Sequence, residues 1–175
     1  YELADLGYFQ ERRVELLEGE IFDMAPQKNA HFLAINLVAK ALSKVFDENN
    51  YWVRGQGPLN LGQASDPEPD VAVVRGAMGT HSDHPSSALL IVEVSDSTLA
   101  FDRKVKASLY AKAGIADFWI VNLRDHCVEV HRDPMVDVDA KYGFRYGKIL
   151  TVKDGEMVST LAAPGAAVPV ADLLP

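Results

Sequence analysis

Two apolar runs, separated by an amphipathic segment, form the clearest pattern along the chain. Residues 89–94 are apolar except for Glu93, and their length and β-branched side chains favour a buried strand. Residues 101–113 have the spacing of a helix that ends at Gly114, and residues 118–121 form a second apolar strand. A strand, a helix and a strand in this order predict two parallel strands joined by a right-handed crossover.

Weaker patterns predict the rest of the fold. Residues 14–24 alternate around Glu18-Gly19, which favours a hairpin. Apolar positions recur every three or four residues over 29–46, which predicts an amphipathic helix with Asn29 as its N-cap. Short apolar runs predict further strands and a docked apolar tail, at residues 51–53, 58–61, 71–74, 128–130, 148–152, 157–161 and, for the tail, 170–174. The order of elements indicates an α/β fold, with a mixed sheet, a helix on each face, an N-terminal hairpin and extra C-terminal strands.

Length and composition limit the class of protein. A chain of 175 residues, 48% hydrophobic and 24% charged, is long enough for one domain over residues 1–175. No apolar run is long enough to span a bilayer, and no secretory signal is visible. The single cysteine, Cys127, excludes an internal disulfide and fits a reducing compartment, so we expect a cytoplasmic location and no membrane partner. The formal net charge of −8 lacks the basic footprint of most nucleic-acid binders, which weighs against a DNA partner.

Two carboxylates stand at the ends of predicted strands. Glu93 lies near the end of one, and Asp70 directly precedes another, at residues 71–74. If these strands are neighbours, the two carboxylates meet at one end of the sheet. Two charges about 4 Å apart repel by roughly 4 kcal/mol at an effective dielectric constant of about 20. Such a pair holds a proton or binds a cation, and carboxylate oxygens suit Mg²⁺ or Mn²⁺.

The helix predicted at residues 101–113 offers a positive partner. Asp102, Lys106 and Tyr110 share one stripe of this helix. The neighbouring stripe is apolar and consists of Val105, Leu109 and Ala113. We expect the apolar stripe to pack on the sheet and the first stripe to lie at its border. Lys106 would then point at the carboxylates, where it could orient a water molecule or stabilise a phosphate.

The ordered segments around these residues resemble a known nuclease superfamily. Pro69-Asp70, followed by Glu93-Val94 and a helix, resembles the PD-(D/E)XK pattern, and the chain is more closely similar to the Uma-type restriction-endonuclease-like family. The matching segments cover most of residues 14–122 and are ELLEGEIFDM, NAHFLAINL, PDVAVV, IVEVSDST and DRKVKASLYAKAGIADFWIVN. The resemblance implies a restriction-endonuclease-like fold, with a mixed sheet flanked by helices.

One position departs from the superfamily pattern. Ser95, two residues after Glu93, stands where the superfamily has a lysine. In Uma-type proteins that lysine lies on the following helix, where Lys106 matches it and Lys104 is the alternative. The resemblance implies that this lysine positions or activates the attacking water.

The resemblance also implies a wider metal shell. The family carries a carboxylate after the hairpin glycine, which Glu20 matches, and a histidine at the start of the first long helix, which His31 matches. Asp70 and Glu93 would hold Mg²⁺ or Mn²⁺, helped by Glu20 and the carbonyl of Val94. His31 would contact phosphate or water.

Ordinary structural roles exist for the two strand-end carboxylates. Asp70 could simply cap a turn after Pro69. Glu93 could pair with a buried arginine, either Arg54 or Arg75.

The other candidates also have such roles. Asp102 could be a helix N-cap, and Lys106 could pair with it four residues away, which would contribute about 0.3 kcal/mol. His31 could be a capping or half-buried histidine, Glu20 a hairpin surface charge, and Tyr110 a core aromatic. Chance placement of Asp70, Glu93 and Lys106 on three successive elements of one topology is less plausible than any single ordinary role.

The resemblance and the residues together predict a Mg²⁺-dependent PD-(D/E)XK-type endonuclease that hydrolyses DNA phosphodiester bonds. Two alternatives stay open. The acidic charge suits a hydrolase of a small phosphate ester, or a binding or regulatory module that keeps the fold without cleavage, for which a homodimer is one arrangement.

Overall fold

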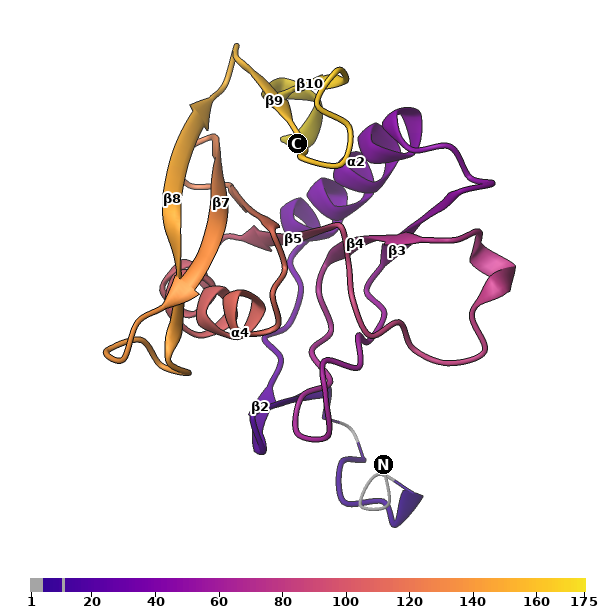
Figure 1. Cartoon of the computed structure of the whole chain (residues 1–175), viewed down its shortest axis with the longest axis vertical. Helices are drawn as coiled ribbons and strands as arrows, with labels where there is room; N and C mark the ends of the chain where they lie inside the picture. Colours follow the sequence, from indigo (N-terminus) through magenta and orange to yellow (C-terminus); the bar gives the residue numbers. More distant parts are fainter. Residues whose placement is uncertain (1–4, 11) are drawn as a thin grey trace.

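A six-stranded mixed sheet forms the centre of the protein, in a computed structural model that describes residues 5–10 and 12–175 (Figure 1). Its strands are β3 (Tyr51–Gly55), β4 (Val71–Arg75), β5 (Leu90–Ser95), β6 (Asp117–Asn122), β7 (Cys127–Val136) and β8 (Phe144–Lys153). They lie side by side in chain order. β5 and β6 are parallel, and the other neighbours are antiparallel. The predicted mixed sheet and parallel crossover are confirmed.

The crossover from β5 to β6 is a helical segment with an irregular middle. It consists of α3 (Leu99–Phe101), a π-helical turn (Asp102–Lys106, the π-turn) and α4 (Ala107–Lys112). The backbone N–H of Ala107 donates to the carbonyl of Asp102, five residues earlier, so the helix is locally wider than an α-helix. Gly114 follows at φ +73°, in the left-handed region that glycine adopts at helix ends. The predicted helix is confirmed, whereas the apolar spacing gave no sign of the π-turn.

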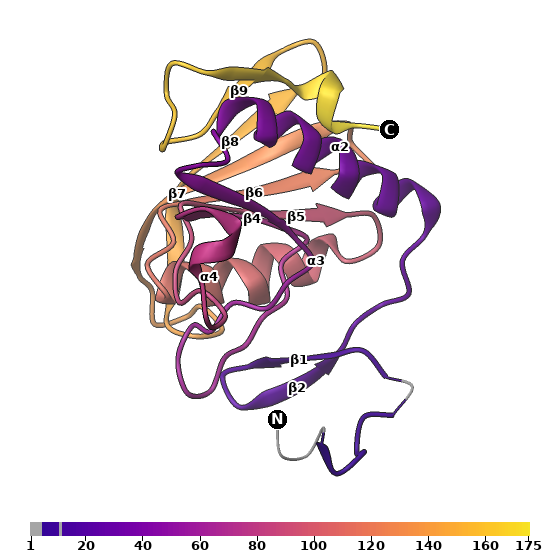
Figure 2. The ribbon, with the colours of Figure 1, turned by 90° about the vertical axis from the view of Figure 1, so that its right-hand side faces the viewer.

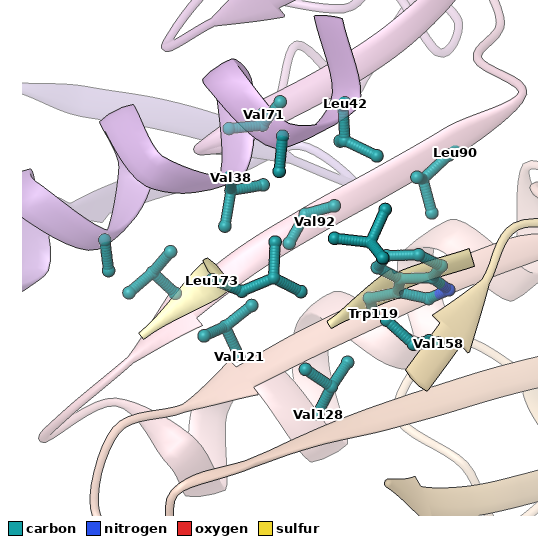
Figure 3. Close-up of a cluster of buried hydrophobic side chains, with 14 of the residues drawn as sticks. Val38, Leu42, Val71, Leu90, Val92, Trp119, Val121, Val128, Val158 and Leu173 are labelled. Carbon is teal, nitrogen blue, oxygen red and sulfur yellow. The ribbon is translucent and has the colours of Figure 1, made fainter. Parts of the chain in front are cut away.

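A helical layer covers each face of the sheet (Figure 2). On one face lies α2 (Asn29–Val45), together with β9 (Met157–Ser159), β10 (Ala167–Pro169) and a 3-10 turn (Val170–Leu173). Figure 3 shows this core, in which Val38 of α2 and Leu173 of the C-terminal turn lie over Val92 and Trp119 of the sheet. Complete burial of Val170 and Leu173 confirms that the apolar tail docks on the core.

The other face of the sheet packs against α4. Leu109 and Tyr110 of α4 are buried against Phe118 and Ile120 of β6. The hairpin of β1 (Val14–Leu17) and β2 (Glu20–Asp23) lies outside this layer and inserts Leu17 into the same core (Figure 2). The positive φ angles of its turn, +51° at Glu18 and +81° at Gly19, match the predicted turn position.

The structure corrects several element boundaries. The N-cap position of α2 is Lys28, not Asn29, and it makes no side-chain capping bond. Residues 58–61 form a loop rather than a strand, because the Leu59 N–H donates to the carbonyl of Pro67 instead of joining the sheet. β7 and β8 extend beyond their apolar centres as a long, largely exposed ribbon. Over the part of the chain that the structure describes, no helix combines the length and apolarity needed to cross a membrane.

Candidate functional site

Asp70 and Glu93 meet where the ladder between β4 and β5 ends. They lie just beyond the last pair of the ladder, in which Val71 faces Val92. The Asp70 backbone N–H donates to Oε2 of Glu93 (3.2 Å), and the Val94 N–H donates to Oδ2 of Asp70 (2.8 Å). Two carboxylates therefore replace the next backbone pairing, and the strand ends fix both side chains at one edge of the sheet.

Lys106 extends from the π-turn to this pair. Its Nζ lies 3.2 Å from Oε1 of Glu93, and the residue is only 4% exposed. Lys104 is exposed and lies outside the cluster, so Lys106 is the lysine that the fold brings to the carboxylates. The ordinary alternative, a pairing of Lys106 with Asp102 alone, is not what the structure shows.

The expected orientation of the helix is only partly correct. Leu109 packs on the sheet as predicted, but Val105 is half-buried and Ala113 is exposed. Asp102, Lys106 and Tyr110, expected at the border, are buried. The polar stripe faces the protein interior because the hairpin covers this side and supplies it with a partner for Lys106, and because the π-turn changes the angular spacing of the helix.

Glu15 of β1 is the functional candidate that sequence reasoning missed. Its Oε2 accepts a hydrogen bond from Lys106 Nζ at 2.5 Å and another from the Glu68 N–H at 3.2 Å. A signal was present, since strand alternation places Glu15 on the same face as the fully buried Leu17. A carboxylate on the inward face of a strand needs a buried partner.

Glu20, the hairpin carboxylate assigned by the resemblance, does not reach the site. Its side chain is 56% exposed and pairs with Lys141 at 3.1 Å. The hairpin turn places Glu20 at the start of β2, where its residue is solvent-exposed. The assignment of Glu20 to the metal shell is therefore corrected, and Glu15 is the carboxylate that the hairpin contributes.

Tyr110 and His31 contact the two strand-end carboxylates from opposite layers. The Tyr110 hydroxyl donates to Oε1 of Glu93 at 2.6 Å, so this residue is more than the core aromatic expected. His31 Nε2 lies 3.2 Å from Oδ1 of Asp70, and this hydrogen bond raises the pKa of His31 above its ordinary value. Each carboxylate is thus oriented by side chains and backbone together.

Asp102 is a fourth buried carboxyl group at this site. It was expected as an N-cap, but Thr98 holds that position and donates its hydroxyl to Oδ2 of Asp102 at 2.8 Å. Burial raises the pKa of Asp102 to about 6. Asp102 therefore takes up a proton more readily than an exposed aspartate does.

Arg54 and Arg75, the arginines considered as partners of Glu93, do not bond to it. Arg54 donates from Nη1 to the carbonyl of Pro58 (2.9 Å), and its guanidinium lies 4.6 Å from the centre of the Trp52 ring. Arg75 is the last residue of β4, whereas Asp70 lies just before the first residue of that strand. The partners of Glu93 are Lys106 and Tyr110.

A pocket of about 160 Å³ lies between the hairpin, the start of α2 and the crossover helix. Its lining includes Lys106, His31 and the four carboxyl groups of Glu15, Asp70, Glu93 and Asp102. Burial raises the pKa of Glu93 to about 8; Lys106 opposes the shift, while Asp70, Asp102 and Glu15 add to it. For Lys106, burial opposes the charged form, but Glu93 and Glu15 outweigh it and raise the pKa above its ordinary value. The site is therefore a protonated lysine in an excess of carboxyl groups.

A larger cavity of about 410 Å³ lies elsewhere, along the loop at residues 76–89. Small polar side chains form much of its wall, and none of the clustered carboxylates reaches it. Size does not mark the site here; the convergence of charged groups does.

Comparison with known proteins gives a family for the chain and a structural neighbour. The sequence matches the model of the Uma2 family, described as "Putative restriction endonuclease", over residues 2–171. The chain belongs to the Uma2 family. No curated protein matches the sequence. Among solved structures, it is similar to a protein described as a "putative nuclease belonging to DUF820" from Anabaena variabilis ATCC 29413, with a TM-score of 0.69 and 13% identity. The similarity covers 94% of this chain and 90% of that one, so the two share a fold.

The donors of this Uma2 family member fit one kind of metal better than another. Among the residues that the structure describes, no three His, Cys, Asp or Glu side chains are arranged to enclose an ion. A cage made only of protein ligands, as in structural zinc sites, is therefore not formed there. Mg²⁺ usually binds one or two carboxylates and keeps water and phosphate as its other ligands. The oxygens of Asp70 and Glu93, within an excess of carboxyl groups, fit that requirement.

Proposed function

We propose that this protein is a metal-dependent endonuclease of the PD-(D/E)XK type that hydrolyses phosphodiester bonds in DNA. One observation carries the proposal. The buried Lys106 ammonium lies 3.2 Å from Glu93, whose Oε2 accepts the backbone N–H of Asp70. Three elements thus bring two oxygen ligands and a cation to one pocket, which supports phosphoryl chemistry.

Asp70 and Glu93, with the carbonyl of Val94, would hold Mg²⁺ or Mn²⁺. Bound there, the ion would neutralise charge on the phosphate and lower the pKa of a bound water. Hydrolysis adds a water molecule across the P–O bond: its oxygen joins the phosphorus, the bond to the leaving oxygen breaks, and that oxygen receives a proton. Because carboxylates keep Lys106 protonated, Lys106 acts as a hydrogen-bond donor that orients water or a phosphate oxygen. His31, on the outer side of Asp70, would contact the phosphate.

A nuclease assay with Mg²⁺ or Mn²⁺ tests this assignment. Asp70→Asn and Lys106→Met should each lower the cleavage rate by about a hundred-fold or more. Lys104→Met, an exposed lysine on the same helical segment, is the matched control and should cleave like the wild type. Equal rates in all four proteins would remove the catalytic assignment.

Calorimetry gives a second readout that does not depend on turnover. The wild type should bind Mn²⁺ or Mg²⁺ at millimolar or lower concentration, and Asp70→Asn should bind more weakly. Absence of binding in the wild type would favour a regulatory module that keeps the fold without cleavage.

A second candidate is a hydrolase of a small phosphate ester. The net charge of −8 and the pocket of about 160 Å³ favour it, because an acidic surface repels a polyanion more than a small ester. Turnover of bis(p-nitrophenyl) phosphate or of a nucleotide, with no cleavage of plasmid or oligonucleotide DNA, would establish this candidate instead.

A further inference from the structure

We infer that the DNA strand which enters this site is single-stranded rather than paired in a duplex. The inference rests on the proposed function and names the substrate class of the same pocket. It follows from how deeply the reactive groups are buried, from the charges at the pocket rim, and from an exposed aromatic residue that follows the lining residue His31 in the chain.

The reactive groups can be reached only through a narrow pocket. Asp70, Glu93 and Lys106 are 8%, 5% and 4% exposed, and the pocket volume is about 160 Å³. Arg13 and the segment 23–27 form the hairpin side of its wall. The phosphates of a duplex lie on a stiff helix that bends only at a cost in free energy, whereas a single strand can bend to present one phosphate to a recess.

The hairpin wall is held in place by several contacts. Leu17 is fully buried, the ring of Phe22 lies 5.4 Å from that of Phe101, and the Gly19 N–H donates to the carbonyl of Ala64. These contacts fix the hairpin as one wall of the pocket, so a flexible single strand, which can bend around this wall, suits the entrance better than a stiff duplex.

Charges around the pocket give little attraction to a duplex. Arg13 pairs with Glu68 at 3.0 Å, and Arg12 pairs with Asp23 at 2.8 Å, on the hairpin side. On the α2 side, Lys28 pairs with Asp96 at 2.8 Å. Each of these exposed cations is already matched by a carboxylate. Duplex binding depends on many Lys and Arg side chains that are free to contact phosphates and release the counterions of the DNA. The rim of this pocket therefore favours a partner that brings fewer phosphates into contact with the protein.

Phe32 offers the contact that a single strand uses and a duplex does not. It is 53% exposed, next to His31 and one helical turn after Lys28 at the start of α2. Unpaired bases stack on exposed aromatic rings without regard to sequence, whereas bases in a duplex are already stacked on one another. A strand with one phosphate near His31 could therefore place a neighbouring base on Phe32.

The test compares three DNAs with one labelled strand: the strand alone, the same strand in a blunt duplex, and a duplex with a single-stranded tail. With Mn²⁺, the wild type should cleave the single strand at least about ten-fold faster than the blunt duplex. In the tailed duplex, the cuts should fall in the tail. Equal rates on strand and duplex would overturn this inference and leave the proposed function standing. Absence of cleavage of all three DNAs, with metal bound, would instead overturn the proposed function.

Phe32→Ala tests the stacking contact. It should raise KM for the single strand by about ten-fold and leave kcat nearly unchanged. Ile149→Ala is the matched control, because Ile149 is 57% exposed but lies on β8, away from the pocket. An unchanged KM in Phe32→Ala, or an equal rise in Ile149→Ala, would refute the role of Phe32. Circular dichroism of both variants checks that they are folded.

Discussion

Lys106 and Glu15, 91 residues apart in the chain, form a buried ion pair with Nζ and Oε2 separated by 2.5 Å. Lys106 comes from the crossover helix and Glu15 from the N-terminal hairpin. Because the same ammonium also lies 3.2 Å from Oε1 of Glu93, one lysine joins the hairpin to the sheet. The pair therefore connects the stability of the hairpin to the geometry of the candidate site.

Glu15→Gln should destabilise the protein by about 2 kcal/mol, because it removes the charged group that accepts a hydrogen bond from the buried ammonium. Urea unfolding measures this loss. Glu20→Gln, which removes an exposed carboxylate of the same hairpin, is the control and should change stability by less than about 0.5 kcal/mol. The double variant Glu15→Gln/Lys106→Met should lose less stability than the two single losses added together. Additive losses would show that the two residues are not coupled.

Tyr110→Phe should weaken Mn²⁺ binding by about ten-fold, because it removes the hydrogen bond that orients Oε1 of Glu93. Tyr146→Phe provides a comparison in the same core, since the Tyr146 hydroxyl donates to the carbonyl of Ile115 at 2.8 Å and does not contact the site. Both variants should lose some stability on unfolding. Only Tyr110→Phe should change the calorimetric affinity, and a similar affinity change in both would contradict a specific role.

Glu129 should make stability depend on pH in the acid range. Burial alone would raise its pKa, but the nearby His131 ring and the hydrogen bonds from Arg103 and Asn122 lower it to about 2. A carboxylate with a depressed pKa stabilises the fold fully above its ordinary value of 4.5, and this stabilisation is lost as the pH falls toward 2. The amount lost is up to about 3 kcal/mol.

Unfolding curves between pH 2 and pH 6 measure this effect. Glu129→Gln should be less stable than the wild type at pH 6 and should lose less stability on acidification. Asp23→Asn, in an exposed pair with Arg12, should keep the acid dependence of the wild type. An acid dependence in Glu129→Gln as steep as in the wild type would assign the effect to other carboxylates.

Gly114→Ala should destabilise the protein by about 1 kcal/mol, because its φ of +73° is unfavourable for a residue with a Cβ atom. Space is not the cause, since an added Cβ would meet nothing within 4 Å. Gly165→Ala has equally open space and no positive φ, so it should be neutral or slightly stabilising. Thermal unfolding of the two variants separates backbone strain from a general effect of replacing glycine.

Residues at the ends of apolar strands could be placed from the sequence. Asp70 and Glu93 border two short apolar runs, and once those runs are neighbours in a sheet the two side chains must meet. The hairpin turn at Glu18-Gly19 was equally visible, because turn chemistry is local.

Contacts between distant segments could not be placed in this way. Which hairpin carboxylate lies near the site depends on how the hairpin packs. The family resemblance indicated Glu20 for the metal shell, whereas the structure brings Glu15 to Lys106. The facing of the crossover helix depends on a backbone hydrogen bond from Ala107 to Asp102, which leaves no mark in the apolar spacing.

The π-turn also has a consequence for how this site can be gained or lost. Each residue of an α-helix advances the chain by about 100° around the axis. The extra residue in Asp102–Lys106 therefore sets the rotation of the side chains before it relative to those after it. Eight residues of uninterrupted α-helix would leave Asp102 and Tyr110 about 80° apart around the axis, so a substitution that restores regular α-helix without removing a residue would move them off a common face. The constellation thus depends on the length of one helical turn as much as on the identity of its residues.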